Sequence, residues 1–233
     1  MLTRSLEIVQ MRVAGVLLAA GEGSRLGQPK ALVELDGMTL GERGVALLRA
    51  GGADPVLVVA GAVEVTIAAA HTVYNPDWRT GMGSSLRVAL KTLTADQSSE
   101  DAANQGANQG ANQGANQGAN EGAHERVGAA VIALADQPLV GPIAIARLIA
   151  AYRDGASVAV AAYDGKPLNP VLIAREHWAE VMTSATGDKG ARAFLRARPE
   201  LVTLVECADT GSADDIDTPE DLARIRDGNH RPF

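Results

Sequence analysis

The chain has 233 residues, of which 46% are hydrophobic, so it can bury one substantial core and we expect one domain. Its net charge of −7 argues against a general binder of nucleic acid or of anionic membranes. Cys207 is the only cysteine, which excludes an internal disulfide and a cysteine-cluster metal site. There is no apolar run long enough to span a membrane and no secretory signal at the N-terminus, so we expect a cytoplasmic protein.

An apolar run near the N-terminus leads directly into a glycine-rich loop. Residues Val13–Ala20 are short and apolar enough for a buried parallel strand. The loop Gly21–Lys30 has three glycines, whose backbone can approach a ligand closely, and two cations, Arg25 and Lys30, that suit phosphate. Leu26 replaces the third glycine of a dinucleotide fingerprint, and the loop has no Gly-Lys-Ser/Thr of a P-loop. The loop therefore indicates another kind of nucleotide-phosphate site, the alternative being a turn with two solvated cations.

Strand and helix patterns alternate along the rest of the chain, which favours parallel βαβ units. We expect helices at Leu40–Ala50, Glu64–Ala70, Ser85–Leu93, Ile143–Tyr152, Glu176–Met182 and Ala191–Arg198, and from Pro219 to about Arg226. We expect further strands at Pro55–Ala60, Thr72–Tyr74, Val127–Ala135, Ser157–Ala162 and Leu201–Val205. These elements predict a domain over residues 12–228, flanked by tails at 1–11 and 229–233.

Residues Ala103–Gly122 consist of four Ala-Asn-Gln-Gly units followed by Ala-Asn-Glu-Gly. A period of four with glycine in every unit cannot bury a consistent face, and the units are far shorter than those of solenoid repeats. We therefore predict a disordered low-complexity surface insertion at about 96–126.

An acidic residue, Asp136, ends the most apolar predicted strand of the chain. The carboxyl ends of central parallel strands are where open α/β sheets bind ligands, and a carboxylate at such a position is a good ligand for Mg²⁺. A helix-cap or turn role for Asp136 is the alternative, because Pro142 and a predicted helix follow soon after.

Two further stretches have structural explanations of their own. Thr218 and Asp221 form a capping-box-like helix start, with Pro219 at the first helical position. Ser84 or Ser85 is a plausible N-cap for the helix that follows them. None of the four histidines lies in a nucleophile motif, so we expect them at the surface: His71, His124, His177 and His230. We expect Cys207 to be a small packing residue.

The motifs together resemble the nucleotidyltransferases that are similar to the molybdenum-cofactor enzymes. The resemblance covers about Arg12 to Asp227 except the repeats, and rests on these stretches: L-A-A-G-E-G-S-R-L-G-Q-P-K from Leu18, N-P-D-W-R-T-G-M-G-S-S-L from Asn75, D-Q-P from Asp136, G-D-K-G-A-R from Gly187 and the acid Asp217. Where the family often shows Gly-His-Pro, this chain has Leu168-Asn169-Pro170. The resemblance implies an α/β, three-layer Rossmann-like (GT-A-like) nucleotidyltransferase fold with a mostly parallel central sheet.

The resemblance also implies roles for individual residues. Catalytic roles would fall to Arg25, Lys30 and Asp136, and Mg²⁺ would be held by Asp136 and Asp217. The residues expected to bind the nucleotide are Ala19, Ala20, Gly21, Gly23, Ser24, Arg25, Lys30, Gly81, Ser84, Ser85 and Asp136. Lys189 and Arg192 are equally compatible with a second substrate's phosphate and with solvated charges, and Asp214 and Asp215 are expected to be solvated or close by.

The expected reaction is transfer of CMP from CTP to the phosphate of molybdopterin, with release of pyrophosphate, because L-A-A-G with D-Q-P resembles the cytidylyltransferase branch. Alternatives are a guanylyltransferase using GTP, another phosphate acceptor such as a sugar or small alcohol phosphate, or a non-catalytic nucleotide-binding module in cofactor insertion. A molybdoenzyme or its insertion chaperone is an expected protein partner. An oxidoreductase using a dinucleotide conflicts with Leu26 in the glycine loop.

Overall fold

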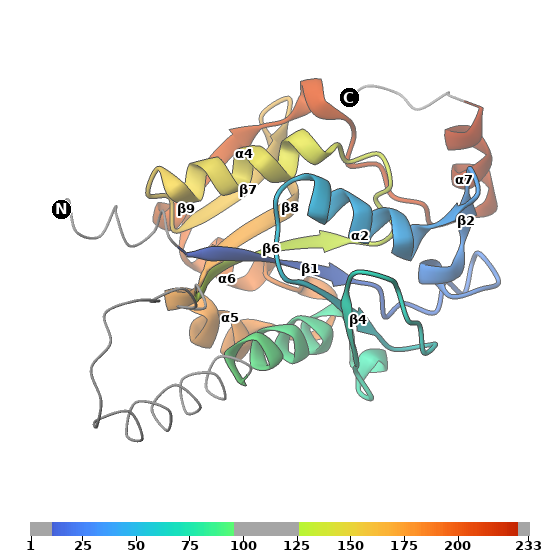
Figure 1. The fold of residues 1–233 in the computed structure, drawn as a ribbon, viewed down its shortest axis with the longest axis horizontal. Coiled ribbons are helices and arrows are strands. Elements are labelled where there is room, and N and C mark those ends of the chain that lie inside the picture. Colours follow the sequence, from blue (N-terminus) through green and yellow to red (C-terminus); the bar gives the residue numbers. More distant parts are fainter. Residues whose placement is uncertain (1–10, 96–125, 228–233) are drawn as a thin grey trace, which may run out of the picture.

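The computed structural model describes residues 11–95 and 126–227 (Figure 1). The predicted tails and the predicted insertion fall almost entirely outside these ranges, so the domain boundaries stay predictions. A seven-stranded sheet with the order β5-β4-β1-β6-β8-β7-β9 forms the centre of the described part. The strands are β1 (Arg12–Leu18), β4 (Val56–Ala60), β5 (His71–Tyr74), β6 (Val127–Leu134), β7 (Val158–Tyr163), β8 (Lys166–Ala174) and β9 (Val202–Glu206).

Helices cover both faces of this sheet (Figure 1). They are α2 (Leu40–Ala50), the helix at 82–95, α4 (Pro142–Arg153), α5 (Trp178–Ser184), α6 (Arg192–Ala197) and α7 (Pro219–Arg226). Helices α2 and α4 lie on one face, whereas the helix at 82–95, α5 and α6 lie on the other. A two-stranded ribbon, β2 (Glu34–Leu35) with β3 (Met38–Thr39), lies beside α7 at one end of the molecule. The predicted three-layer α/β fold is confirmed.

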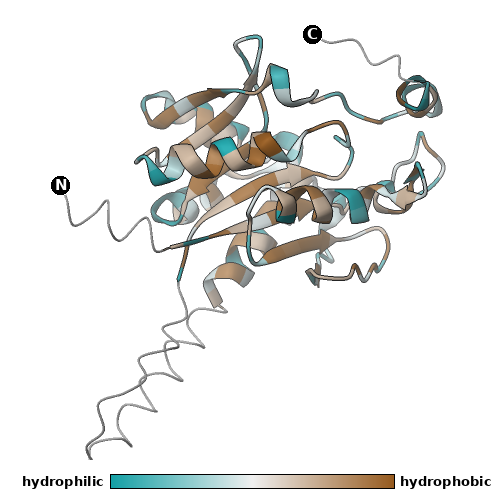
Figure 2. Cartoon of the chain, turned by 45° about the horizontal axis from the view of Figure 1, so that its top comes forward, coloured by the Kyte–Doolittle hydropathy of each residue, from teal (hydrophilic) through white to brown (hydrophobic). Residues whose placement is uncertain are grey.

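Alternating residues of β1 build the two layers of the core. Leu17 packs with Leu48 of α2 in the cluster on one face, whereas Val16 belongs to the cluster on the other face with Leu86 and Trp178. A strand covered on both faces must be apolar along its whole length, which explains the unbroken run in the sequence. Figure 2 shows this hydrophobic colouring along the central strands, with hydrophilic residues on the outer sides of the helices.

Strand directions place the ends of four strands at the same edge of the sheet. β1 pairs in parallel with β4 and β6, and β4 pairs in parallel with β5. β8 is the exception, because it runs antiparallel to both β6 and β7. The loops that follow β1, β4, β5 and β6 therefore meet at one edge, where a ligand site is expected.

A predicted helix and a predicted helix N-cap are wrong, and one strand of the central sheet was missed. Residues 64–70, predicted as a helix, have no regular structure, since the β-branched run Val65–Ile67 disfavours a helix and Ala69 has φ of 61°. The helix at 82–95 starts before Ser84 and Ser85, so neither is its N-cap. Strand β8 escaped prediction because prolines, Pro167 and Pro170, interrupt its pattern.

Cys207 is buried, as expected of a packing residue, and His71 is exposed. His177 corrects the expectation of surface histidines, because its side chain is only 13% exposed and its ring lies 5.7 Å from that of Phe194. His124 and His230 lie outside the described residues.

Candidate active site

The ends of β1 and β6 form the floor of a cavity of about 490 Å³. The two strands are neighbours in register, with Leu18 paired to Leu134, so the backbone segments that follow them leave the sheet together. Fifteen residues line the cavity: Leu18, Ala19, Ala20, Gly21, Glu22, Lys30, Trp78, Arg79, Gly81, Met82, Ser85, Leu134, Ala135, Asp136 and Asp188. The cavity thus lies at the sheet edge that the parallel topology predicts for ligand binding.

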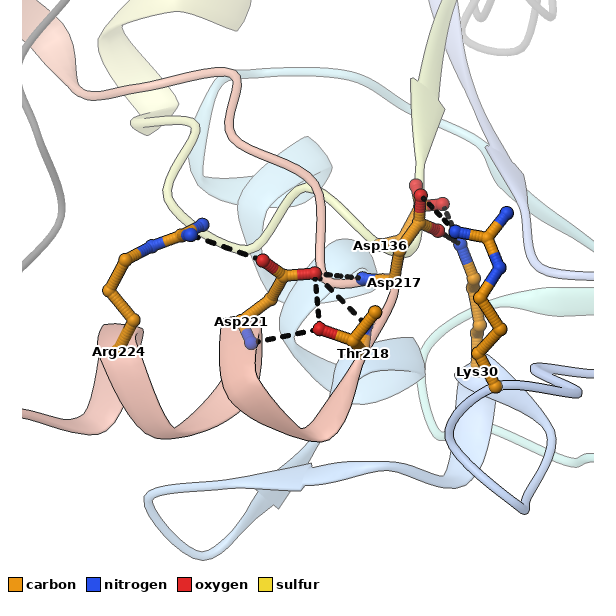
Figure 3. Close-up of polar contacts among 7 residues, drawn as sticks. Lys30, Asp136, Asp217, Thr218, Asp221 and Arg224 are labelled. Carbon is orange, nitrogen blue, oxygen red and sulfur yellow. Dashed lines mark hydrogen bonds and ion pairs between the residues drawn. The ribbon is translucent and has the colours of Figure 1, made fainter.

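Lys30 joins two carboxylates at this edge (Figure 3). Its Nζ donates to Oδ2 of Asp136 at 2.6 Å and to Oδ1 of Asp217 at 2.5 Å. The Lys30 and Asp136 side chains are each 19% exposed, so the pair is largely withdrawn from solvent, whereas Asp217 is 42% exposed. Burial alone would lower the pKa of the Lys30 ammonium, but the charges and hydrogen bonds of the two carboxylates outweigh this effect and raise that pKa.

The two carboxylates are brought together by separate parts of the chain that are tied to each other. Asp136 lies two residues after the end of β6, and its backbone carbonyl accepts a hydrogen bond from the Ile216 N–H at 2.8 Å. Asp217 immediately precedes α7, where Thr218 and Asp221 form the predicted capping box. The Asp221 carboxylate also accepts the Asp217 N–H at 3.2 Å, which anchors the backbone of that residue (Figure 3).

Asp215 extends the acidic character of this site. Desolvation by the surrounding protein, together with the charges of Asp136 and Asp217, raises the pKa of the Asp215 carboxyl, although the residue as a whole stays exposed. Asp214 is half-buried. Asp215 therefore agrees with the expectation that these two acids are solvated or close to the site.

The glycine-rich loop folds back on itself before it reaches Lys30. Gly23 has φ of 59°, and a Cβ at this position would lie 2.1 Å from the Gln28 carbonyl oxygen, so no side chain fits. The Lys30 N–H donates to the Gly21 carbonyl at 3.3 Å, and this bond closes the loop. Arg25 is 71% exposed, and its guanidinium lies 3.7 Å from Oδ2 of Asp217.

Seven of the predicted nucleotide-binding residues line the cavity, namely Ala19, Ala20, Gly21, Lys30, Gly81, Ser85 and Asp136. Gly23, Ser24 and Arg25 are not among its lining residues, and neither is Ser84. The Ser84 hydroxyl instead donates to the backbone carbonyls of Asp77 and Gly81, at 3.0 and 2.8 Å.

Eight lining residues were not proposed as site residues: Leu18, Leu134 and Ala135 at the ends of β1 and β6, and five others, Glu22, Trp78, Arg79, Met82 and Asp188. These five others lie inside stretches that carried the family resemblance, so their position in those motifs was the available signal. Arg79 stacks on the Trp78 ring at 4.8 Å. Asp188 belongs to the loop Gly187–Lys189, which packs against Gly81, where a Cβ would lie 2.4 Å from the Gly187 carbonyl carbon. Lys189 and Arg192 are exposed and do not line the cavity.

The carboxylate oxygens around Lys30 are chemically suited to bind a divalent cation. Asp136 and Asp217 already gather around one cationic group, so the space between them tolerates positive charge. The described residues contain no group of three or more His, Cys, Asp or Glu side chains that could hold a metal. With nucleotides, Mg²⁺ is commonly bound by one or two carboxylates together with phosphate oxygens and water. Asp136 and Asp217 therefore fit this ion.

Residues 15–202 match the family described as MobA-like NTP transferase domain. Nicotine blue oxidoreductase from Paenarthrobacter nicotinovorans is 33% identical over 226 residues, which cover 91% of this chain and 96% of that protein. A probable molybdenum cofactor guanylyltransferase from Opitutus terrae is 37% identical over 84 residues, 36% of this chain and 42% of that protein.

Among solved structures, Rv0371c from Mycobacterium tuberculosis is 25% identical, with a TM-score of 0.68 and coverage of 93% of this chain and 98% of that chain. The same protein has been solved in complex with manganese, with a TM-score of 0.65 at 22% identity and coverage of 93% and 99%. None of the helices within 11–95 and 126–227 is both long and apolar enough to cross a membrane. The family match spans most of the chain and includes the glycine-rich loop and Asp136, and the chain therefore belongs to the family of MobA-like NTP transferase domains.

Proposed function

We propose that this protein is a cytoplasmic, Mg²⁺-dependent nucleotidyltransferase that transfers CMP from CTP to the phosphate of molybdopterin. The observation that carries the proposal is the cluster in which Lys30, the last residue of the glycine-rich loop, donates hydrogen bonds to Asp136 and Asp217. One cation and two carboxylates, the groups that a metal–nucleotide complex requires, thus lie beside a cavity of a size that small-molecule ligands occupy.

The proposed reaction is an in-line displacement at phosphorus. An oxygen of the acceptor phosphate forms a bond to the α-phosphorus of the nucleotide, and the bond between that phosphorus and the bridging oxygen breaks, so that pyrophosphate leaves. The acceptor phosphate is ionised near pH 7, so no protein base is needed, and catalysis rests on positioning and charge neutralisation.

Each residue of the site has its own role in the proposed reaction. Asp136 and Asp217 would hold Mg²⁺, which supplies charge neutralisation at the phosphate oxygens when bound. Lys30 would stabilise the charge at the transferring phosphoryl group, and the exposed Arg25 would hold the leaving pyrophosphate. The manganese complex of the mycobacterial relative supports a divalent ion in this fold.

The choice of base and acceptor rests on the L-A-A-G and D-Q-P motifs. The similarity to a probable guanylyltransferase keeps GTP as the alternative nucleotide, and a sugar or small alcohol phosphate as the alternative acceptor. A molybdoenzyme or its insertion chaperone would receive the product.

A second candidate function, an oxidoreductase, is favoured by the relative named nicotine blue oxidoreductase, which matches along nearly its whole length. The glycine-rich loop gives no support to dinucleotide binding, because Leu26 replaces the third glycine and the loop leads into a short 3-10 turn, Lys30–Leu32, not into a helix. Consumption of NADH or NADPH with nicotine blue as the acceptor tests this candidate directly.

The deciding experiment measures pyrophosphate release with Mg²⁺ and molybdopterin, using CTP, GTP, ATP and UTP in turn. The Asp136→Asn variant removes the charge at constant shape, and Asp154→Asn at the exposed end of α4 is its matched control. Release with CTP that is lost in D136N and kept in D154N supports the proposal. Release with GTP alone would assign the protein to guanylyl transfer, and no release with any nucleotide would contradict transfer to molybdopterin.

A further inference from the structure

A buried asparagine lies beneath one wall of the cavity. Asn75 directly follows β5, is completely buried, and donates through Nδ2 to Oγ of Ser84 at 2.8 Å and to Oγ of Ser85 at 3.0 Å. Its Oδ1 accepts the backbone N–H of Asp77 at 3.0 Å. A backbone N–H can only donate, so this bond fixes which side of the amide is oxygen and which is nitrogen.

This network determines where the hydroxyl protons of the two serines point. The amide nitrogen of Asn75 can only donate, so both serine oxygens must accept from it. Ser84 then donates its own proton to a backbone carbonyl. For Ser85, the structure gives no acceptor among the described residues, although this residue is only 3% exposed and lines the cavity. The Ser85 proton is therefore left for a ligand in the cavity.

Ser85 lies in the helix at 82–95, and its bond to Asn75 at the end of β5 separates it from the phosphate-binding end of the cavity. In the strand order, β5 lies three strands from β6, which corresponds to about 14 Å at the usual strand spacing. The cations and carboxylates cluster where β1 and β6 end, whereas Ser85 shares its wall with Trp78 and Met82. A nucleotide with its phosphates at Lys30 therefore extends its base toward Ser85.

We propose that Asn75 is a positioning residue that fixes Ser85 as a hydrogen-bond donor to a carbonyl oxygen of the nucleobase; this inference rests on the proposed nucleotide site. Cytosine, uracil and guanine each carry a ring carbonyl oxygen, and adenine carries none. The buried donor is satisfied by the first three bases and is left without its carbonyl partner by adenine. The site thereby selects against ATP through a residue that does not touch the nucleotide.

The test compares nucleotide affinities of the full-length protein and three variants. Ser85→Ala removes the donor. Asn75→Asp keeps the shape and still accepts the Asp77 N–H, but its carboxylate accepts the Ser85 proton and turns it away from the cavity. Thr92→Ala is the matched control, because its hydroxyl lies on the same helix and donates to the Val88 carbonyl at 3.0 Å. Dissociation constants are measured for CTP, GTP, UTP and ATP, and for inorganic tripolyphosphate, which has no base.

We expect the wild type and T92A to bind the best carbonyl-bearing nucleotide more tightly than ATP, and S85A and N75D to lose about three- to tenfold of that preference. Their affinity for tripolyphosphate should stay unchanged, which a general loss of structure would not allow. The inference is overturned if the wild type shows no preference against ATP, or if S85A keeps the full preference; S85A decides the matter if N75D does not fold. A wild type that shows the preference but releases no pyrophosphate would contradict the proposed reaction and leave this inference standing.

Discussion

At the scale of single residues, Lys30 occupies the space between the two carboxylates that are proposed to hold the metal. Its ammonium donates charge-assisted hydrogen bonds to Asp136 and Asp217, at 2.6 and 2.5 Å. A divalent cation and this ammonium therefore compete for the same pair of oxygens. Phosphate groups of a bound nucleotide would offer Lys30 another partner and so release the carboxylates.

The competition makes a prediction for the nucleotide-free protein. Lys30→Met keeps much of the apolar stem and removes the charge, so we expect Mn²⁺ to bind several-fold more tightly without nucleotide. Pyrophosphate release should nevertheless fall about 10²–10³-fold, because a charge contact to the transferring group is lost. Electron paramagnetic resonance of Mn²⁺ measures the first effect. Lys91→Met at an exposed position is the control, and unchanged Mn²⁺ affinity in K30M would contradict the competition.

Several residues that line the cavity could be predicted from the sequence, but not how they are connected. Gly21, Lys30 and Asp136 stand at motif positions, and the structure brings them to one cavity. Nothing local indicates that Asn75 bonds two serines nine and ten residues later, or that Asp188 lies against the loop at Gly81. Both contacts depend on the packing of distant segments, which residue patterns do not encode.

At the scale of elements, predictions succeeded where local signals and tertiary packing agree. Helix α2 was predicted with its observed bounds from apolar residues at helical spacing and the glycines that follow its end, and in the structure Thr39 and Glu42 form a capping box at its start. Strand β8 was missed because its local pattern is broken by prolines, while its pairing partners lie elsewhere in the chain. Only its last residues, from Val171, pair with β6, and its pairing with β7 is irregular between Val171 and Pro167, where β8 has two more residues than the facing stretch of β7 from Val160 to Ala162.

The end of β9 is fastened to the turn between β7 and β8 by one carboxylate. Glu206 accepts backbone N–H groups of Ala208, Gly165, Asp164 and Cys207, and these bonds lower its pKa. A lowered folded-state pKa means that the stabilisation is complete above the ordinary pKa of a glutamate and disappears as the pH falls through the folded-state value.

We therefore expect Glu206→Gln to lower the melting temperature at pH 7, since an amide presents one acceptor oxygen where the carboxylate presents two. The difference from the wild type should shrink as the pH is lowered below about 4, where the wild-type carboxyl also becomes protonated. Thermal unfolding across a pH series measures both effects. Glu34→Gln, at an exposed position in β2, is the control, and a difference that grows toward acid would contradict the assignment.

At the scale of the whole molecule, the repeat segment Ala103–Gly122 lies outside the described residues. All residues that line the cavity lie within 18–188 but outside this segment, and its period of four with glycine in every unit cannot supply a consistent apolar face. We expect a protein that lacks Ala103–Gly122 to keep the wild-type melting temperature and nucleotide affinity. Insolubility of this shortened protein, or loss of turnover, would contradict the assignment of the segment as a dispensable insertion.

The two halves of the molecule meet backbone to backbone beside the cavity. Gly83, in the first turn of the helix at 82–95, packs so closely on Ala185 and Thr186 that a Cβ would lie 2.8 Å from the Ala185 carbonyl carbon and the Thr186 nitrogen. Backbone atoms cannot move aside as the tip of a flexible side chain can. The first half of the chain, which carries the glycine-rich loop, is thereby held against the loop that bears Asp188.

Gly83→Ala should therefore separate these segments, in contrast to the usual stabilisation when alanine replaces glycine in a helix. We expect a loss of about 1–3 kcal/mol in the free energy of unfolding, the usual cost of overpacking a tight contact. Because Gly81, Met82 and Asp188 line the same wall of the cavity, nucleotide affinity should fall in parallel, while tripolyphosphate affinity changes less. Denaturant unfolding and equilibrium binding measure the two effects, and a G83A protein as stable as the wild type would show that the two halves are not held together at this contact.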